Sequence, residues 1–274
     1  MEKWCRNCHR SFDEVGPTVE SGATFSVCSQ CRPLKTHLNQ SEQNPEWARS
    51  FDALYHLYLQ MASSGNLLTA GEVLEKAQKL GLSTLDFLIG IVQPALYEIG
   101  KAWESGKLSI AEEHKVTTFC ERIFHLAHTQ ILRTIPSLQT TRPTVLLVNA
   151  PENYHVLGIR IAELWLLSKG ISCFTVYPGI PIPDTIELVR FLNPAVFGIS
   201  IATESHEDSL HELENRLQKE PQPPIIVAGG YAVQSGILKA EAFSYITLVS
   251  DLNSLSEIVQ KTTSIKKAKL KRVG

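Results

Sequence analysis

The 274-residue chain lacks a long uninterrupted apolar run, an excess of charge of one sign and a high content of aromatic residues (8%). Its most apolar stretch is broken by Gln93 and Pro94, which leaves it too short to span a membrane, and the first residues lack the apolar stretch of a signal peptide. With 26 basic against 28 acidic residues, the chain has no overall positive field for nucleic acid or for a membrane surface. These absences predict a cytoplasmic protein without a membrane partner.

Cysteine is also scarce, and four of the six cysteines fall within the first 31 residues as two Cys-x-x-Cys pairs. In a reducing compartment such pairs are more typical of a tetrahedral zinc than of disulfides. We therefore predict a zinc ribbon in residues 1–33, with the ligands Cys5, Cys8, Cys28 and Cys31. An iron–sulfur cluster is an open alternative. Attachment of haem to Cys-x-x-Cys-His is rejected, because it requires export and leaves the second pair without a role.

A helical region follows a polar linker (34–46). Between Trp47 and Ile135 the apolar residues recur three and four positions apart, which is the period of amphipathic helices. Glycine-containing breaks divide this region into four predicted helices, at 47–62, 68–80, 84–105 and 110–134. Residues 47–136 are thus expected to form a four-helix domain.

From residue 142 onward, short apolar runs alternate with helical stretches. The candidate strands are 144–149, 172–177, 195–200, 225–228 and 245–249, and the candidate helices are 157–169, 183–192, 206–218, 234–241 and 253–262. Apolar strands separated by helices predict an α/β domain over residues 142–264, with a doubly wound parallel five-stranded sheet covered on both faces. The basic tail (265–274) is expected to be solvated.

A ligand of such a sheet binds beyond the carboxyl ends of the strands, so the loops after the strands are the places to search. Suitable residues follow the first, third and fourth strands: His155 and Gly158, Ser200 and Thr203, and Gly229 and Gly230. A single loop histidine is more often structural than a ligand. Three neighbouring loops that carry such residues favour one shared site.

These loops resemble the cobalamin-binding domain shared by methionine synthase, corrinoid methyltransferase proteins and cobalamin photoreceptors. The family pattern has Asp or Glu followed by x-His-x-x-Gly, then Ser-x-Leu and Gly-Gly, and it is similar here to residues 153–158, 200–202 and 229–230. The resemblance implies a flavodoxin-like (Rossmann-like) fold. It further implies that His155 ligates cobalt from below and displaces the dimethylbenzimidazole base, whose nucleotide tail threads between Ser200 and the double glycine.

The chain departs from this pattern at two positions. Asn153 stands where the family has the carboxylate that hydrogen-bonds the histidine ring, and Ala202 stands where it has leucine. Because an amide brings no charge, we expect His155 to be a weaker donor to cobalt than the family histidine, unless Glu152 takes the place of the carboxylate.

A second motif lies between the last two predicted helices, where Trp103 is followed after nine residues by Glu113 and His114. It resembles the cap of CarH-type light-dependent regulators, in which four helices cover the upper face of adenosylcobalamin. The resemblance implies that Trp103 packs on the adenosyl group and that Glu113 contacts its ribose. It also implies that His114 takes the upper cobalt position after light has broken the cobalt–carbon bond. The alternative is a core tryptophan and a solvated Glu-His pair.

Together the two resemblances predict a cobalamin-dependent, light-responsive regulator rather than an enzyme, with adenosylcobalamin as the favoured form of the cofactor. The zinc ribbon would contact DNA or a regulatory protein, and a homo-oligomer is left open. One alternative is a corrinoid protein that carries methyl groups for a methyltransferase system. Another is a module that binds cobalamin without responding to light.

Overall fold

The computed structural model describes residues 45–135 and 143–273, with side chains at 53–66, 68–135 and 143–264. The predicted zinc ribbon, its four cysteines and most of the linker lie outside the described residues. The chain divides between Thr134 and Ile135 into two compact units, one helical and one built around a sheet.

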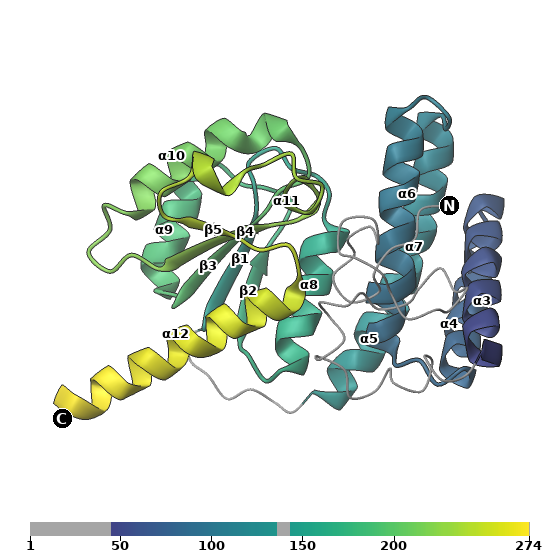
Figure 1. Ribbon diagram of the computed structural model, residues 1–274, viewed down its shortest axis with the longest axis horizontal. Helices are drawn as coiled ribbons and strands as arrows, with labels where there is room; N and C mark the ends of the chain where they lie inside the picture. The colour runs from purple at the N-terminus through teal and green to yellow at the C-terminus, as the bar shows by residue number, and fades with distance from the viewer. Residues whose placement is uncertain (1–44, 136–142, 274) are drawn as a thin grey trace. The chain divides into compact units, whose positions relative to one another are not determined.

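The helical unit contains the four predicted helices, close to their expected limits (Figure 1). They are α3 (Pro45–Ser64), α4 (Ala70–Lys79) after the short turn η2 (Leu67–Thr69), the segment α5–η3–α6 (Thr84–Phe87, Leu88–Val92 and Gln93–Glu104) and α7 (Ile110–Thr134). Their apolar faces enclose a core of fully buried aromatic and aliphatic side chains, which include Tyr55, Tyr58, Phe87, Phe119 and Ile123. The helical periodicity of the sequence is therefore satisfied by burial.

A π-helical turn interrupts the third helix, which the sequence analysis treated as continuous. The turn is η3, and the N–H of Gln93 donates to the carbonyl of Leu88, five residues earlier. Pro94 follows directly and has no N–H to continue the α-helical ladder. The helix therefore accommodates the proline with one wider, π-helical turn and continues beyond it.

The second unit is a parallel sheet with the strand order β2-β1-β3-β4-β5. The strands are β1 (Val145–Asn149), β2 (Cys173–Val176), β3 (Val196–Ser200), β4 (Ile225–Gly229) and β5 (Ile246–Leu248). The helices are α8 (Leu157–Ser168), α9 (Ile182–Leu192), α10 (Glu207–Leu217), α11 (Tyr231–Gln234) and α12 (Leu252–Val273), with short turns η4 (Glu204–His206) and η5 (Ala240–Ala242). The predicted five-stranded α/β fold is confirmed.

Helices cover both faces of this sheet (Figure 1). Leu146 and Val148 of β1 pack in the core formed with α9 and α10, whereas Val145 and Leu147 pack in the core formed with α8 and α12. Successive strand residues point to opposite faces, so two buried faces require strands that are apolar throughout.

The predicted helix at 234–241 is wrong. The structure has only the four-residue α11 before this point, and Gly236 adopts a left-handed conformation (φ +74°) that ends it. The predicted last helix is too short, because α12 continues to Val273.

No single helix in the described ranges is long and apolar enough to cross a membrane. Two segments, Ala70–Lys79 and Thr84–Glu104, reach the length and apolar composition of a membrane span only when they are taken together as a bent pair.

Candidate functional site

The carboxyl ends of three strands lie in one row of the sheet. Asn149 at the end of β1 is paired with Ser200 at the end of β3, and Ser200 is paired with Gly229 at the end of β4. The strand order reverses at β1 and β3, and this switch point is where ligands bind in doubly wound sheets. The prediction that the three loops are neighbours is therefore confirmed.

The loop after β1 is fixed by two buried asparagine side chains, each only 1% exposed. The amide nitrogen of Asn153 donates to the Ser200 carbonyl (2.9 Å), and its oxygen accepts from the N–H of His155 (3.0 Å). The amide nitrogen of Asn149 donates to the carbonyls of Asn153 (3.0 Å) and His155 (3.4 Å). Glu152, with φ +62°, forms the turn that brings these groups together.

His155 presents an exposed side chain directly before the first turn of α8. Among the described residues, neither Asn153 nor Glu152 hydrogen-bonds its imidazole. The asparagine that replaces the family carboxylate is thus occupied by main-chain groups. Within residues 45–135 and 143–273 no hydrogen bond holds either ring nitrogen of His155, so both can face solvent or a ligand.

The three predicted glycines differ in what surrounds them. A Cβ on Gly230, whose φ is +109°, would lie 2.4 Å from the carbonyl oxygen of Ile201, and one on Gly229 would lie 3.2 Å from Val249. A Cβ on Gly158 would meet nothing within 4 Å. Gly230 is therefore required by the close approach of the loop after β3, and Gly229 is packed tightly against Val249 after β5, whereas the surface at Gly158 is open.

Ser200 and Thr203 contribute to the site in different ways. The Ser200 carbonyl accepts from Asn153 and from the N–H of Ala150 (3.0 Å), which ties the histidine loop to β3. The Thr203 hydroxyl bonds Ser205 (2.7 Å) and the Nδ1 of the buried His206 (3.0 Å). Thr203 thus organises its own loop. Neither His206 nor Asn149 was among the site residues predicted from the sequence.

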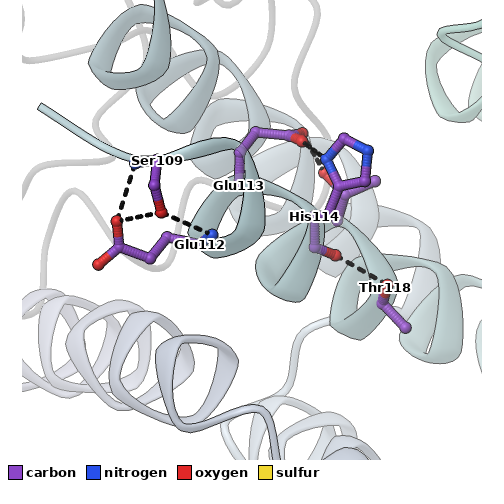
Figure 2. Close-up of polar contacts among 6 residues, drawn as sticks. Ser109, Glu112, Glu113, His114 and Thr118 are labelled. Atoms are coloured by element: carbon purple, nitrogen blue, oxygen red, sulfur yellow. Dashed lines mark hydrogen bonds and ion pairs between the residues drawn. The ribbon is translucent and has the colours of Figure 1, made fainter. Parts of the chain in front are cut away.

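In the helical unit, a reciprocal cap fixes the start of α7 (Figure 2). The N–H and hydroxyl of Ser109 donate to the Glu112 carboxylate (2.8 and 2.7 Å), and the N–H of Glu112 donates to the Ser109 hydroxyl (3.3 Å). The hydrogen bonds from Ser109 hold the pKa of Glu112 below its usual range. This capping box places the next two residues, Glu113 and His114, in the first turn of the helix.

Glu113 and His114 are joined through their side chains (Figure 2). One carboxylate oxygen of Glu113 lies 2.5 Å from Nδ1 of His114, and the other accepts from the Thr117 hydroxyl (2.6 Å). The His114 side chain is 75% exposed and that of Glu113 is 23% exposed. A carboxylate bound to one ring nitrogen fixes the tautomer and leaves the other as an acceptor, as is usual for histidine ligands of metals.

Trp103, in the last turn of α6, is 45% exposed. Trp103 is therefore not the core residue of the alternative interpretation, although the exposed His114 at the start of α7 agrees with the solvated Glu-His pair of that interpretation. A half-exposed indole is suited to stack on a planar or apolar ligand.

The two cysteines of the described chain are not ligands. Burial raises the pKa of Cys120 to about 12, and its thiol pairs with the Tyr58 hydroxyl (2.8 Å); burial also raises the pKa of Cys173 to about 12. No group of three or more potential metal ligands occurs in the described ranges. The four predicted zinc ligands lie outside these ranges, so the zinc stays a prediction.

The sheet site fits a histidine-ligated corrinoid in three respects. The His155 imidazole is exposed, the backbone at Gly158 is open, and the switch point carries a buried polar atom, Oδ1 of Asn149, without a hydrogen-bond partner among the described residues. A buried acceptor left unpaired is unusual, and such an atom can accept a hydrogen bond from a water or from a ligand.

Residues 54–127 match the family model for the B12 binding domain. The matched segment lies within the helical unit and runs from α3 into α7. Over 147 residues, the chain is 31% identical to the HTH-type transcriptional repressor CarH of Myxococcus xanthus. This alignment covers 53% of this chain and 47% of that protein. The chain thus spans about half the length of this relative.

Two further similarities extend over more of the chain. Over 175 residues it is 28% identical to an uncharacterized 20.5 kDa protein from the bchF-crtJ intergenic region of Rhodobacter capsulatus, covering 62% of this chain and 86% of that protein. The monomethylamine corrinoid protein of Methanosarcina barkeri superposes with a TM-score of 0.63 at 13% identity, covering 78% of this chain and 98% of that one. At this identity the superposition establishes the fold alone.

Proposed function

We propose that this chain is a cobalamin-dependent regulator that responds to light through the cofactor's upper ligand. The observation that carries the proposal is the exposed His155 beside the row Asn149, Ser200 and Gly229, in a chain whose residues 54–127 match the B12 binding domain model. The sheet unit supplies the lower ligand, and the helical unit supplies residues for the upper face.

On the lower side, His155 would donate a ring nitrogen to cobalt in place of the cofactor's own base. A neutral imidazole is a common metal ligand, and a loop at the switch point of the sheet can present one without rearranging a strand. The absence of a side chain at Gly230 lets the loops after β3 and β4 lie close together, and Gly158 leaves room for close approach to the backbone.

On the upper side, Trp103 would stack on the organic ligand of an adenosylcobalamin, and Glu113 would accept from its ribose hydroxyls. His114, oriented by Glu113, would occupy the vacant position after that ligand has left. When bound, the cofactor supplies a photolabile cobalt–carbon bond. The chain contributes two sets of contacts, one for each state, and such a difference is what shifts a conformational equilibrium.

The regulatory part of the proposal draws on the likeness to CarH, which is named as a transcriptional repressor. The output would pass through the cysteine-containing segment 1–33, by contact with DNA or with a regulatory protein. An assembly of several copies would be one route by which the state of the cofactor reaches this segment.

The experiment is an absorption spectrum and a gel-filtration profile of the purified chain with adenosylcobalamin, in the dark and after green light. We expect co-elution in the dark, with the cofactor's own base displaced, and after light a spectrum with a histidine on each side. The variant His155→Ala should lose the lower ligand, and His114→Ala should lose only the post-light spectrum. His125→Ala, an exposed histidine on the same helix as His114, is the matched control.

Three outcomes contradict parts of this proposal. Failure of the wild-type chain to retain any corrinoid removes cobalamin binding. An unchanged elution volume and unchanged affinity for DNA or protein after photolysis leaves a binding module without a light response. Transfer of a methyl group from the methylcobalamin-loaded chain to a methyltransferase would instead identify a methyl carrier.

A further inference from the structure

We propose that Asn149 and Asn153 are positioning residues that clamp the main chain of His155, so that the orientation of the cobalt ligand is set through its backbone rather than through its ring. This inference rests on the proposed function only in taking His155 as the ligand. The clamp itself is a property of the chain without cofactor.

The two side chains hold both polar groups of His155. Its N–H donates to Oδ1 of Asn153 (3.0 Å), and its carbonyl accepts from Nδ2 of Asn149 (3.4 Å). Asn149 also binds the carbonyl of Asn153 (3.0 Å), and Asn153 reaches across to the carbonyl of Ser200 (2.9 Å), 47 residues away. Both asparagines are 1% exposed, and shielding from water strengthens the hydrogen bonds that their side chains make.

An amide is required at both positions. Each asparagine uses its nitrogen to bind a carbonyl oxygen, and a carboxylate in the same place would bring two acceptors together without a proton between them. At position 153 the amide oxygen is also used, so the group acts as donor and acceptor at once. Aspartate at this position cannot reproduce the clamp unless it is protonated.

The unpaired oxygen of Asn149 supports the same conclusion. Its nitrogen makes two hydrogen bonds, whereas Oδ1 is buried without a partner in the described part of the chain. A buried acceptor without a partner destabilises the fold. The side chain is therefore present for its two donated bonds, both of which go to the loop that carries His155.

The clamp has a consequence for the metal bond. Among the described residues no carboxylate binds the His155 ring, so the imidazole is a weaker donor than a histidine paired with aspartate or glutamate.

The first test uses the chain without cofactor. Amide hydrogen exchange at His155, followed by NMR, should become at least about tenfold faster in Asn153→Ala and Asn149→Ala, because each removes a buried hydrogen bond of this loop. Asn215→Asp, on an exposed position of α10, should leave the exchange unchanged. Wild-type exchange rates in both alanine variants would overturn the clamp.

The second test uses cobalamin and Asn153→Asp. Under the clamp, this variant should bind cobalamin at least about tenfold more weakly than the wild type and lose the histidine-ligated spectrum as readily as Asn153→Ala does. If the Asn153 side chain instead contacted the His155 ring, Asn153→Asp would restore the family's carboxylate, and the histidine-ligated spectrum would persist with equal or tighter binding. That second result would overturn the proposal.

The two tests separate this inference from the proposed function. A wild-type chain that retains no corrinoid contradicts cobalamin binding, whereas the exchange measurement still decides whether the clamp exists. If Asn153→Asp does not fold, Asn153→Ala and Asn149→Ala carry the same decision through the exchange rates.

Discussion

Replacing Gly158, Gly229 and Gly230 by alanine, one at a time, should separate the residues that the fold requires from those that the cofactor requires. The sequence pattern presents all three as contacts of one ligand. The structure gives each a different environment, so the three variants should differ both in stability without cofactor and in cobalamin binding.

The magnitudes follow from the distances. At Gly230 (φ +109°, ψ −172°) an alanine meets the strain of a backbone region that essentially only glycine adopts, about 1–3 kcal/mol, and overpacking against main-chain atoms of Ile201, about 1–3 kcal/mol, which together give about 2–6 kcal/mol. At Gly229 the added methyl lies 3.2 Å from Val249, and about 1 kcal/mol is expected. At Gly158, in the first turn of α8, alanine meets no atom and gains up to about 1 kcal/mol of helix propensity.

The assay is urea unfolding of the chain without cofactor, paired with the amount of adenosylcobalamin that co-elutes on gel filtration. We expect Gly230→Ala to lose both stability and binding. Gly158→Ala should keep or increase stability and still lose binding, since its methyl would occupy the open surface next to His155. Wild-type binding by Gly158→Ala, or a stability as high as that of wild type in Gly230→Ala, would refute this reasoning.

Three further predictions concern other parts of the chain. Metal analysis should find about one zinc per chain, and replacing any of the four amino-terminal cysteines by serine should lower this content, whereas a wild-type chain free of zinc would refute the ribbon. Since burial raises the pKa of Cys120 from 9.0 to about 12, its thiol should resist alkylation in the folded chain at pH 8, and alkylation as fast as in urea would contradict this. The contribution of Cys120 to stability should be lost only as the pH rises from about 9 towards 12. Since hydrogen bonds from Ser109 lower the pKa of Glu112, this cap should stabilise α7 at a pH above 4.5, the ordinary pKa of the carboxyl, and should weaken as the pH falls below it. The variant Glu112→Gln should therefore lose less stability than the wild type on acidification, and identical pH profiles would count against the cap.

Much of the fold could be predicted because its signals are local. Strands buried on both faces read as apolar runs, and the glycines near residues 65, 81 and 106 marked the breaks between helices. The placement of three loops at one site also followed, since the carboxyl ends of parallel strands share an edge. The helix predicted at 234–241 failed because Gly236 takes a left-handed conformation that overrides the helical pattern around it.

The interactions within the site could not be predicted in the same way. Asn149 is the last residue of a buried strand, and nothing in the local pattern marks its amide as a partner of the loop six residues on. The sequence pattern places Asn153 where the family has a carboxylate beside the histidine ring. In the structure its hydrogen-bond partners are main-chain groups, one of them 47 residues away. Contacts of this kind depend on the strand register and not on sequence spacing.

The central claim is that a nitrogen of His155 binds cobalt. The most direct measurement is the electron paramagnetic resonance spectrum of the complex with cobalamin in its paramagnetic divalent form, using a chain whose histidines carry the heavy isotope of nitrogen. Each cobalt line should split into a doublet, because the ligand nitrogen comes from the labelled chain, and the doublet should vanish in His155→Ala. A triplet from ordinary nitrogen, the signature of the cofactor's own base still on the metal, would contradict the account.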